Sequence, residues 1–589
     1  MITTDPARDA LLSDHAKSLL AKHYLREGEQ PQDGYARAAT AWAGGDAALA
    51  QRLYDAVSRG WFMFASPVLS NAPRPGEKIK ALPISCFLTY VPDSIQGLCE
   101  HTTESRWLSV LGGGVGAHWS AVRSVSEVAP GPIPFLHTHD ADMSAYRQGK
   151  VRRGSYAAYM DVSHPDIEEF LALRQPTGDA NRKCLGSGFH HAVNIPDAFM
   201  VAVERDAPWH LIDPNDGTVR HTLRARELWE RILETRYRTG EPYLCFIDTA
   251  NRALPEPLKA LGLRIHGSNL CSEIMLPTAE DRTAVCCLSS LNLETYDEWS
   301  GTTLVGDLVE MLDNVLQHFI DNAPDSLSRA RFSAQRERSL GLGVMGWHAY
   351  LQRRRVAFDS DEALGINEDI FSSIYQQAVL RSRQLADRRG EAPDMVGTGL
   401  RNAHLLAIAP TANSATIAGT SPSIELTKAN AYTHRTRAGS HLVKNRYLEE
   451  LLAEKGMDTD EVWQSIILNR GSVQHLDCLT DHERAVFKTA IEVDQTWVID
   501  HAAGRQPYID QGQSVNLFFP PRADKGYLNR VHLLAWRQGL KALYYLRTET
   551  SSRADAVSQK IERVKLSDTG ETSLQPVAKS GDDCVACQG

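Results

Sequence analysis

The chain has 589 residues, of which 42% are hydrophobic and 23% charged, and its 63 Lys and Arg against 73 Asp and Glu give a net charge of −10. A chain of this length can bury an ordinary core without disulfide or metal support. The mild acidity offers no basic surface, which excludes nucleic acid as an expected partner. Ten cysteines are too few for a disulfide scaffold, so we expect thiols that are available for chemistry.

The N-terminus shows no sign of targeting or membrane insertion. Its first residues, MITTDPARDALLSDHAKSLL, alternate charged and apolar side chains and lack the apolar core of a signal peptide. No stretch of eighteen apolar residues occurs anywhere, so no membrane-spanning helix is expected. We therefore expect a soluble protein of the cytoplasm.

The first predicted elements are helices, and strands follow them. Apolar residues recur every three or four positions in 7–24 and 34–60, which predicts a helical segment over 1–60. Amphipathic helices such as 223–239 and 363–390 then alternate with short apolar runs between Gly and Pro. The runs expected to be strands are 62–71, 84–91, 157–162, 190–195, 240–249, 404–419, 514–519 and 540–548.

Two larger units follow from this pattern. Alternation of strands and helices over 61–550 predicts one large α/β sheet or barrel. Residues 551–589 are polar and contain no aromatic residue, so they predict a flexible C-terminal tail.

The segment GSNLCSEIMLP carries the strongest chemical pattern. Asn269, Cys271 and Glu273 occupy alternate positions, so an extended backbone would place an amide, a thiol and a carboxylate on one face. A loop with an inert buried cysteine is the other interpretation of this spacing.

Further cysteines make redox chemistry an option. Cys86 lies in PISCFLTYV and Cys286 begins CCLSSLNL, each among apolar residues, and a pair facing Cys271 would form a dithiol able to deliver two electrons. Cys287 would point to the opposite face of the same strand. Each of these cysteines is also compatible with a purely structural role.

The tail ends with Cys584 and Cys587 in a C-x-x-C motif. A zinc site needs four ligands, and no second such motif lies nearby, so no metal site is expected. The motif is either an unused surface feature or a mobile dithiol that exchanges with a buried disulfide.

Tyr544 and Tyr545 are adjacent in GLKALYYLRTE. Neighbouring residues of a regular strand face opposite sides, so ordinary packing is one interpretation. If both rings instead stack toward Cys271, they could pass an oxidising equivalent in short steps.

Two segments are suited to bind phosphate. LGGGVGAHW lets a backbone approach a ligand, but it follows a helix-like segment, which weakens a dinucleotide-binding interpretation. In APTANSATIAGTSPS, hydroxyl and backbone N–H groups follow a strand-like run and could form an anion site. Either segment could also be an ordinary turn.

Together these segments resemble the large, catalytic subunit of class I ribonucleotide reductase. The resemblance covers residues 61–550 and the tail, and its motifs occur in the order of the family. They are SPVLSN, ISCFLTYVPDSI, GGGVG, QGKVRRG, NLCSEI, CCLSSLNL, PTANSATIAGTSPSIE, LYY and the terminal C-x-x-C.

The resemblance implies a fold and a reaction. The fold is a ten-stranded α/β barrel of two antiparallel five-stranded halves with a central finger loop, preceded by a small helical segment. The reaction reduces ribonucleoside diphosphates to 2′-deoxyribonucleoside diphosphates. Cys271 would form a thiyl radical and abstract the 3′-hydrogen, with Glu273 as base and Asn269 as a hydrogen-bonding group. Cys86 and Cys286 would supply two electrons and become a disulfide.

Binding sites and partners also follow from the resemblance. The substrate contacts that it implies are Ser66, Ser85, Gly114, Asn269, Leu270, Cys271, Ser272, Glu273, Pro410, Thr411, Ala412, Asn413 and Ser414. Tyr545 would receive a radical from a metal-containing small subunit and Tyr544 would pass it to Cys271. Thioredoxin or glutaredoxin would re-reduce the tail, and no cofactor would be bound in this chain itself.

The resemblance also implies regulation at a dimer interface. A deoxynucleoside triphosphate or ATP would bind there as specificity effector, near Asp93, Arg123, Gln148 and Arg152. Only about 65 residues precede Ser66, too few for the N-terminal ATP-cone of many relatives, so control of overall activity at such a cone is not expected.

Three alternatives are compatible with parts of the sequence. A cobalamin-dependent ribonucleotide reductase would share the barrel and the cysteines, but it needs no tyrosine pair for an external radical. A catalytically inert nucleotide-binding relative would need neither the cysteines nor Glu273. A nicotinamide-dependent dehydrogenase would rest on the glycine spacing alone.

Overall fold

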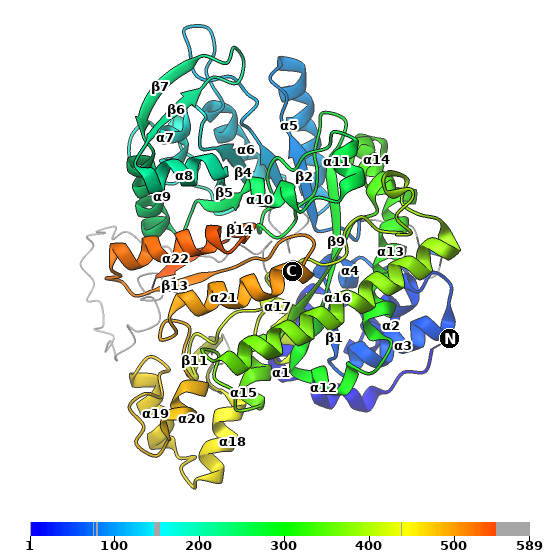
Figure 1. The fold of residues 1–589 in the computed structure, drawn as a ribbon. Coiled ribbons are helices and arrows are strands. Elements are labelled where there is room, and N and C mark those ends of the chain that lie inside the picture. The colour runs from blue at the N-terminus through cyan, green and yellow to red at the C-terminus, as the bar shows by residue number, and fades with distance from the viewer. Residues whose placement is uncertain (1, 75, 78–80, 147–153, 437–438, 549–589) are drawn as a thin grey trace, which may run out of the picture.

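The computed structural model describes residues 2–74, 76–77, 81–146, 154–436 and 439–548. Gln148, Arg152, Cys584 and Cys587 lie outside these residues, as does the tail 551–589. The described part is a mixed α/β structure with a curled half-barrel sheet and an all-helical N-terminal part (Figure 1).

The N-terminal part consists of short, well-capped helices. Ser13 accepts a hydrogen bond from the backbone of Ala16, which starts a new helix inside the stretch 7–24 that was expected to be continuous. Pro31 begins another helix three residues before the expected start at 34. The elements are η1 (Pro6–Leu11), α1 (Asp14–His23), α2 (Pro31–Trp42) and α3 (Ala47–Ser58).

Five parallel strands form the first half of the sheet. They are β2 (Cys86–Tyr90), β3 (Gly114–His118), β4 (Ser155–Asp161), β5 (Phe189–Ile195) and β8 (Tyr243–Phe246), paired in that order. Their side chains are almost entirely buried, as expected for parallel strands covered by helices.

Helices and one hairpin connect these strands on the outer side (Figure 1). The connections are α5 (Ile95–Val110), α6 (Ile133–Ala145), α7 (Ile167–Leu171), α8 (Asp197–Arg205), the hairpin β6 (Pro208–Ile212) and β7 (Val219–Arg224), and α9 (Ala225–Thr239). Gly240, at φ 83°, ends α9 as its left-handed C-cap, which confirms the helix expected at 223–239.

A second row of strands joins the first half antiparallel at both ends. β9 (Ala284–Asn292) pairs with β2, and β14 (Ala542–Leu543) pairs with β8. β10 (Leu340–Met345) runs parallel to β9, and β1 (Phe62–Phe64) lies antiparallel to it.

Parallel pairing continues beyond β10. A single bridge joins Leu342 to Leu406, and another joins Ile408 to Gln513. Next along the row, β13 (Leu517–Phe519) pairs parallel with β15 (Leu546–Thr548). These contacts connect four chain segments that are separated by more than 20 residues in sequence.

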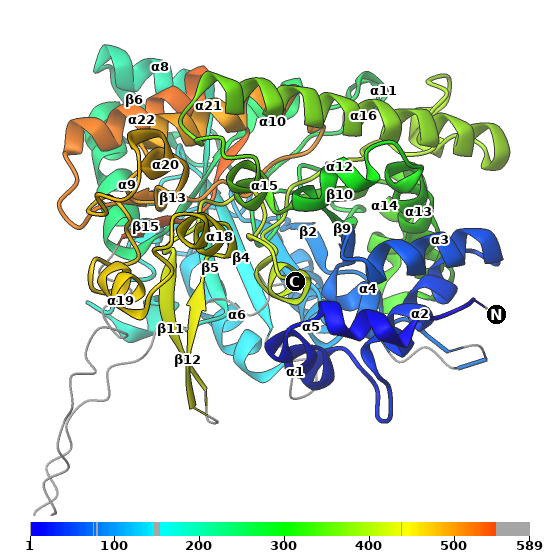
Figure 2. The ribbon, with the colours of Figure 1, turned by 90° about the horizontal axis from the view of Figure 1, so that it is seen from below.

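Helices cover this second row and form a projecting subdomain (Figure 2). α13 packs on β9, and the long helix α16 packs on α13 and α21. The remaining α-helices of the described residues are α4 (Ser66–Ser70), α10 (Ile247–Arg252), α11 (Glu256–Ala260), α12 (Tyr296–Trp299), α13 (Leu304–Asn322), α14 (Ser328–Glu337), α15 (Trp347–Arg353), α16 (Asp361–Arg389), α17 (Ala412–Ala418), α18 (Arg446–Glu454), α19 (Asp460–Leu468), α20 (Asp481–Val486), α21 (Gln495–Arg505) and α22 (Lys525–Arg537). The hairpin of β11 (Ala431–Thr436) and β12 (Gly439–Lys444) extends away from the body beside α18 and α19.

Two runs that were expected to be strands continue as helices. In 62–71, the strand ends at Phe64 and Pro67 sits in the first turn of α4. In 404–419, the bridges end at Ile408 and α17 follows Pro410, ending at Gly419 with φ 68°. The apolar content was correctly taken to indicate burial, but it does not distinguish a buried strand from a buried helix.

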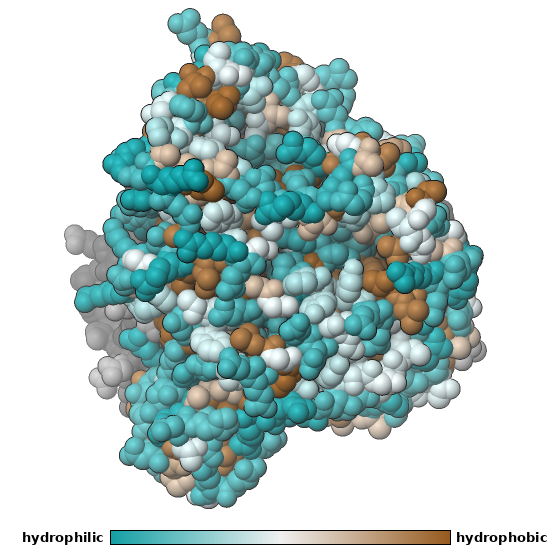
Figure 3. All heavy atoms as spheres, in the orientation of Figure 1, coloured by the Kyte–Doolittle hydropathy of each residue, from teal (hydrophilic) through white to brown (hydrophobic). Residues whose placement is uncertain are grey.

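Within the described residues, no helix is long and apolar enough to cross a membrane. The face shown in Figure 3 is mostly hydrophilic, with hydrophobic residues in small scattered groups.

Candidate functional site

An irregular segment, residues 264–276, lies inside the sheet between the two rows of strands. On one side it touches β3, because a Cβ added at Gly116 would lie 2.0 Å from the carbonyl oxygen of Ser268. On the other side the backbone N–H of Gly512 donates to the carbonyl of Glu273 at 2.8 Å. Both rows therefore hold this segment, and position 116 requires glycine because no Cβ fits there.

The glycine-rich run thus packs against the chain itself. A Cβ at Gly113 would lie 2.4 Å from the ring of Phe87, and one at Gly114 would lie 3.0 Å from Leu270. Strand β2 and the internal segment therefore occupy much of the space beside these glycines, where a ligand was expected to approach the backbone.

Asn269, Cys271 and Glu273 lie in a turn, which agrees with the loop interpretation of their spacing and not with an extended backbone. Ser272 has a φ of 65°, and its N–H donates to the carbonyl of Asn269 at 3.4 Å. The Asn269 Oδ1 accepts hydrogen bonds from the backbone of Glu273 at 3.1 Å and of Ile274 at 3.2 Å. Asparagine side chains often form such local bonds with nearby backbone groups, and alternate spacing does not reveal them.

Glu273 is a buried carboxyl group with few polar neighbours. Its side chain lies 3.3 Å from the Oγ of Ser514 and 4.0 Å from the Sγ of Cys86. Burial raises the pKa of Glu273 to about 7, although hydrogen bonds from its own backbone, Asn269 and Ser514 act in the opposite direction. A carboxyl group with this pKa can exchange a proton near neutral pH.

Cys86 and Cys286 are direct partners across the antiparallel pair β2 and β9. Opposed residues of such a pair have Cα atoms roughly 4.5–5.5 Å apart, within the range of a disulfide. Both are thiols in this structure. The Nδ2 of Asn269 donates to the Sγ of Cys86 at 3.3 Å, which places the cysteine pair beside the turn.

Gln511 connects Cys286 with the internal segment. Its Nε2 donates to the Sγ of Cys286 at 3.5 Å, and its Oε1 accepts from the backbone of Met275 at 3.1 Å. Burial holds the pKa of Cys286 well above its usual value, so this sulfur stays protonated in the resting site. Cys287 points the other way, toward the carbonyl of Leu312 in α13, as strand alternation predicted.

Tyr544 and Tyr545 occupy the break between β14 and β15, so strand alternation does not separate them. Their ring centroids are 4.3 Å apart, and Tyr243 packs against both, at 4.7 Å and 5.0 Å. Tyr544 is 1% exposed and belongs to the same buried cluster as Cys271. The two rings therefore contact each other at a tilt of 54°, and their part in radical transfer stays a prediction.

The remaining predicted substrate residues lie on several different elements. Ser85 lies beside Cys86, with 3.7 Å between its Oγ and the Cys86 Sγ. Ser66 is hydrogen-bonded to the hydroxyl of Tyr24 from the N-terminal helices, at 3.0 Å. The stretch 410–414 enters α17, whose first turn directs backbone N–H groups outward.

Asp93 and Arg123 lie together, away from the cysteines. The Nε of Arg123 is 2.9 Å from the Asp93 carboxylate, and the Arg123 backbone N–H also donates to it at 3.1 Å. They follow the carboxyl ends of β2 and β3, the opposite ends of these strands from Cys86 and Gly114.

Sequence patterns did not identify several residues that shape the site. Each lies far from the NLCSEI segment in sequence, and only the fold brings it close. They are Tyr159, whose hydroxyl donates to the Asn269 carbonyl at 2.6 Å, and Gln511, Ser514, Tyr243, His190 and Glu241.

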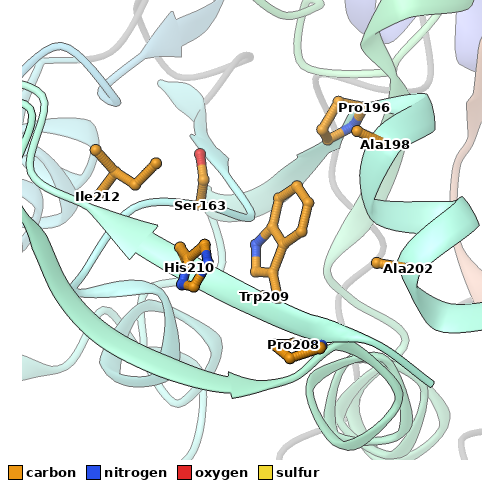
Figure 4. Close-up of a pocket in the computed structure, with 8 residues that line it drawn as sticks. All are labelled: Ser163, Pro196, Ala198, Ala202, Pro208, Trp209, His210 and Ile212. Carbon is orange, nitrogen blue, oxygen red and sulfur yellow. The ribbon is translucent and has the colours of Figure 1, made fainter.

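A surface pocket lies elsewhere, between the β6 strand and α8 (Figure 4). Its lining contains none of the predicted site residues: Ser163, Pro196, Ala198, Ala202, Pro208, Trp209, His210 and Ile212. Among the described residues, no group of three or more His, Cys, Asp or Glu side chains is arranged to hold a metal ion.

Comparisons with known proteins agree over nearly the whole chain. The ribonucleotide reductase barrel domain matches residues 84–398 and 392–546, and the ribonucleotide reductase all-alpha domain matches residues 10–77. A protein of Frog virus 3 (isolate Goorha) is 55% identical over 581 residues, covering 98% of this chain and 99% of the relative. The ribonucleoside-diphosphate reductase large subunit of Invertebrate iridescent virus 3 is 42% identical over 649 residues, covering all of both chains.

A solved structure is similar as well. The Actinobacillus ureae class Id ribonucleotide reductase alpha subunit superposes with a TM-score of 0.83 at 37% sequence identity. The match covers 93% of this chain and 98% of that one.

Proposed function

This chain belongs to the large subunits of class I ribonucleotide reductase, and from that premise we propose which residues carry out each step of its reaction. It is the catalytic large subunit, a ribonucleoside-diphosphate reductase of class EC 1.17.4.1. One observation carries the assignment of roles: Cys86 faces Cys286 directly, and the turn with Asn269 and Glu273 touches that pair.

The proposed chemistry begins at Cys271. Its thiyl radical takes the 3′-hydrogen of the ribose, and Glu273 takes the proton of the 3′-hydroxyl. The 2′-hydroxyl leaves as water, and Cys86 and Cys286 give two electrons and two protons while forming their disulfide. The 3′-hydrogen then returns from Cys271, so the net change is one ribonucleotide and two thiols to one deoxyribonucleotide, one disulfide and water.

Substrate is proposed to bind across both rows of strands. Ser66, Ser85 and Gly114 would contact the sugar side, and the backbone of residues 269–273 would surround the reacting carbons. Residues 410–414 would hold the diphosphate, supported by the outward N–H groups at the start of α17.

The radical is proposed to come from outside this chain. A metal-containing small subunit would supply the one-electron oxidant, and the ring contacts of Tyr545 and Tyr544 support a relay toward Cys271. The cobalamin-dependent alternative has no use for this pair.

Regeneration and regulation are the remaining parts of the proposal. Cys584 and Cys587 would reduce the buried disulfide by thiol exchange and be re-reduced by thioredoxin or glutaredoxin. Two copies of the chain would form a homodimer that binds a deoxynucleoside triphosphate or ATP near Asp93, Arg123, Gln148 and Arg152. Thiol-based turnover suits the reducing cytoplasm.

The proposed architecture is the ten-stranded barrel of two antiparallel halves. The antiparallel joints of β2 with β9 and of β8 with β14 support closure, with 264–276 as the central finger loop. We divide the chain into a helical segment at 1–60, the barrel at 61–550 and the redox tail at 551–589.

Reconstitution tests this function. The chain with a radical-bearing small subunit and thioredoxin should reduce cytidine diphosphate, and neither subunit alone should do so. With Cys584 and Cys587 both changed to Ser, thioredoxin-driven turnover should stop, but one pre-reduced cycle should remain. Cys86→Ser should lose that single cycle too. Turnover by the isolated chain with adenosylcobalamin would instead establish the alternative.

The pKa of Glu273 leads to a pH prediction. Below pH 7 burial keeps the carboxyl group protonated, and a protonated group cannot accept the 3′-hydroxyl proton. We therefore expect kcat/KM to rise with pH through about 7 and then to level off. Glu273→Gln should abolish this rise of kcat/KM with pH and lower kcat by roughly 10²–10⁴-fold, the usual contribution of a general base.

Ser514→Ala is the matching control. It removes a hydroxyl that favours the Glu273 carboxylate and also bonds to the Cys271 carbonyl. The rise of kcat/KM should therefore move to higher pH, and the maximal rate should fall by much less than in Glu273→Gln. If kcat/KM rises at the same pH in this variant as in the unmodified enzyme, another group is responsible for the titration.

A further inference from the structure

The hydroxyl of Tyr545 lies beside a buried pair of ionisable groups that the reaction scheme does not use. It is 3.3 Å from the Nδ1 of His190 on β5, and that same nitrogen is 2.8 Å from the Oε1 of Glu241. The side chains of His190 and Glu241 are each 6% exposed. Burying such a pair is costly in free energy, and a purely packing role would be met more cheaply by apolar side chains.

The hydrogen bonds around Glu241 identify its protonation state. It accepts from the Nδ1 of His190, and its other oxygen accepts from the backbone N–H and the Nδ1 of His191, both at 3.1 Å. Burial opposes ionisation, but His190, Arg174 and these bonds hold the pKa of Glu241 well below its usual value. Glu241 is therefore a carboxylate, and the Nδ1 of His190 carries a hydrogen.

This assignment determines the direction of the contact with Tyr545. The one hydrogen on the Nδ1 of His190 is shared between two acceptors. The Glu241 carboxylate at 2.8 Å takes the stronger branch, and the phenolic oxygen of Tyr545 at 3.3 Å accepts the weaker branch of this bifurcated hydrogen bond. The phenolic hydrogen then points away from His190. It is left for transfer to the oxidised group or to the neighbouring tyrosine.

We propose that Glu241 and His190 are positioning residues that hold the Tyr545 phenol in the orientation from which it exchanges its hydrogen with Tyr544. The proposal rests on the radical relay proposed above. Glu241 acts through His190, because it bonds to the imidazole and orients it.

The relay step balances in electrons and protons. Tyr545 gives one electron and one proton to the oxidised group of the small subunit and becomes a phenoxyl radical. It then takes one hydrogen atom from Tyr544, which takes one from the thiol of Cys271. The bond from His190 persists throughout, so neither His190 nor Glu241 changes its own proton count.

The surroundings of Tyr545 explain why it needs a hydrogen bond that positions its hydroxyl. Tyr544 is 1% exposed and is fixed by its neighbours, whereas Tyr545 is only partly buried at the edge of the cluster. Tyr243 packs edge-on against Tyr545 at 5.0 Å, and Arg547 lies over its ring at 4.7 Å. Neither ring contact fixes rotation about the axis that sets the direction of the hydroxyl.

His191 provides a matched control from the same strand. It binds the same carboxylate, but as the neighbour of His190 it faces the opposite side of β5, against Phe170 at 5.4 Å. Replacing either histidine removes one hydrogen bond from Glu241, and only replacement of His190 removes the donor to Tyr545.

The test uses the complete enzyme with small subunit, effector and reductant. His190→Phe should lower kcat on the order of 10–100-fold, as expected for a misplaced reacting group, with KM for cytidine diphosphate unchanged. His190→Asn should restore most of the rate, because its amide N–H can replace the imidazole donor. His191→Phe should keep kcat near that of the unmodified enzyme.

A spectroscopic measurement separates positioning from packing. With a 3-aminotyrosine at position 545, the radical can be trapped there, and its g-tensor responds to hydrogen bonds at the oxygen. The spectrum should change in His190→Phe and not in His191→Phe.

Each contrary outcome has a distinct meaning. An unchanged kcat and spectrum in His190→Phe, with Tyr545→Phe inactive, would overturn the positioning role and leave the relay intact. Equal losses in the two histidine variants, or no rescue by His190→Asn, would also overturn it. Full activity of Tyr545→Phe would instead refute the relay.

Discussion

Cys271→Ser is expected to abolish nucleotide reduction while nucleotide binding persists. The serine hydroxyl holds its hydrogen much more strongly than a thiol does, so the tyrosine relay cannot oxidise it. The loss should be on the order of 10⁴-fold or more, which corresponds to ~5.5 kcal/mol of added barrier.

The local structure makes this substitution informative. Cys271 is held through its carbonyl, which accepts from the Ser514 hydroxyl at 2.6 Å, and its side chain is 5% exposed. Exchange of sulfur for oxygen changes little in size, so the turn of 269–273 should remain. Activity is measured as deoxycytidine diphosphate formed, and binding by equilibrium dialysis of substrate and effector.

Cys245→Ser is the matched control. Cys245 lies on β8 in the same buried cluster, 1% exposed, and it has no part in the proposed chemistry. A buried hydroxyl there should cost about 1–3 kcal/mol of folding stability and leave the rate nearly unchanged. Retained turnover in a clean Cys271→Ser preparation would contradict the assignment of the radical.

Regular elements of the fold were largely predictable from the sequence. The apolar run at 84–91 contains β2, and the runs at 157–162 and 190–195 overlap most of β4 and β5, because parallel strands buried on both faces need continuous apolar residues. The helices expected at 223–239 and 363–390 became α9 and α16, since their apolar stripes and terminal glycines mark them clearly.

The pairing of strands was harder to predict from the sequence. Cys86 and Cys286 are separated by 200 positions, and only the register of β2 against β9 makes them neighbours. The resemblance implied this pair, whereas apolar surroundings alone described two separate buried cysteines.

The side chains around the site could not be predicted from the sequence for the same reason. Gln511 and Ser514 reach the turn from a segment more than 230 residues away, and no local pattern marks them. The turn itself depends on the Asn269 side chain bonding to backbone groups, which the alternate spacing of Asn269, Cys271 and Glu273 does not reveal. Tertiary contacts decide such features after the elements have formed.

Tyr544→Phe is expected to stop radical arrival at Cys271 and leave the fold intact. Only a hydroxyl is lost, and the backbone of Tyr544 stays fixed by bonds with Val515 at 2.8 Å and Arg236 at 2.6 Å. Phenylalanine is not oxidised at a comparable potential, so the rate should fall on the order of 10³-fold or more, which corresponds to ~4 kcal/mol of barrier. Nucleotide affinity should be nearly unchanged.

Tyr243→Phe gives the comparison that isolates the radical step. Tyr243 packs against both relay rings, at 4.7 Å and 5.0 Å, and the change again removes one hydroxyl from the same cluster. If the relay runs through Tyr544, Tyr243→Phe should reduce nucleotides at close to the normal rate. In Tyr544→Phe the small subunit should keep its radical signal during incubation with substrate and effector, because the oxidising equivalent has no onward path. Equal losses in both variants would point to disturbed packing. Full activity of Tyr544→Phe would favour a reductase that makes its radical without a partner subunit.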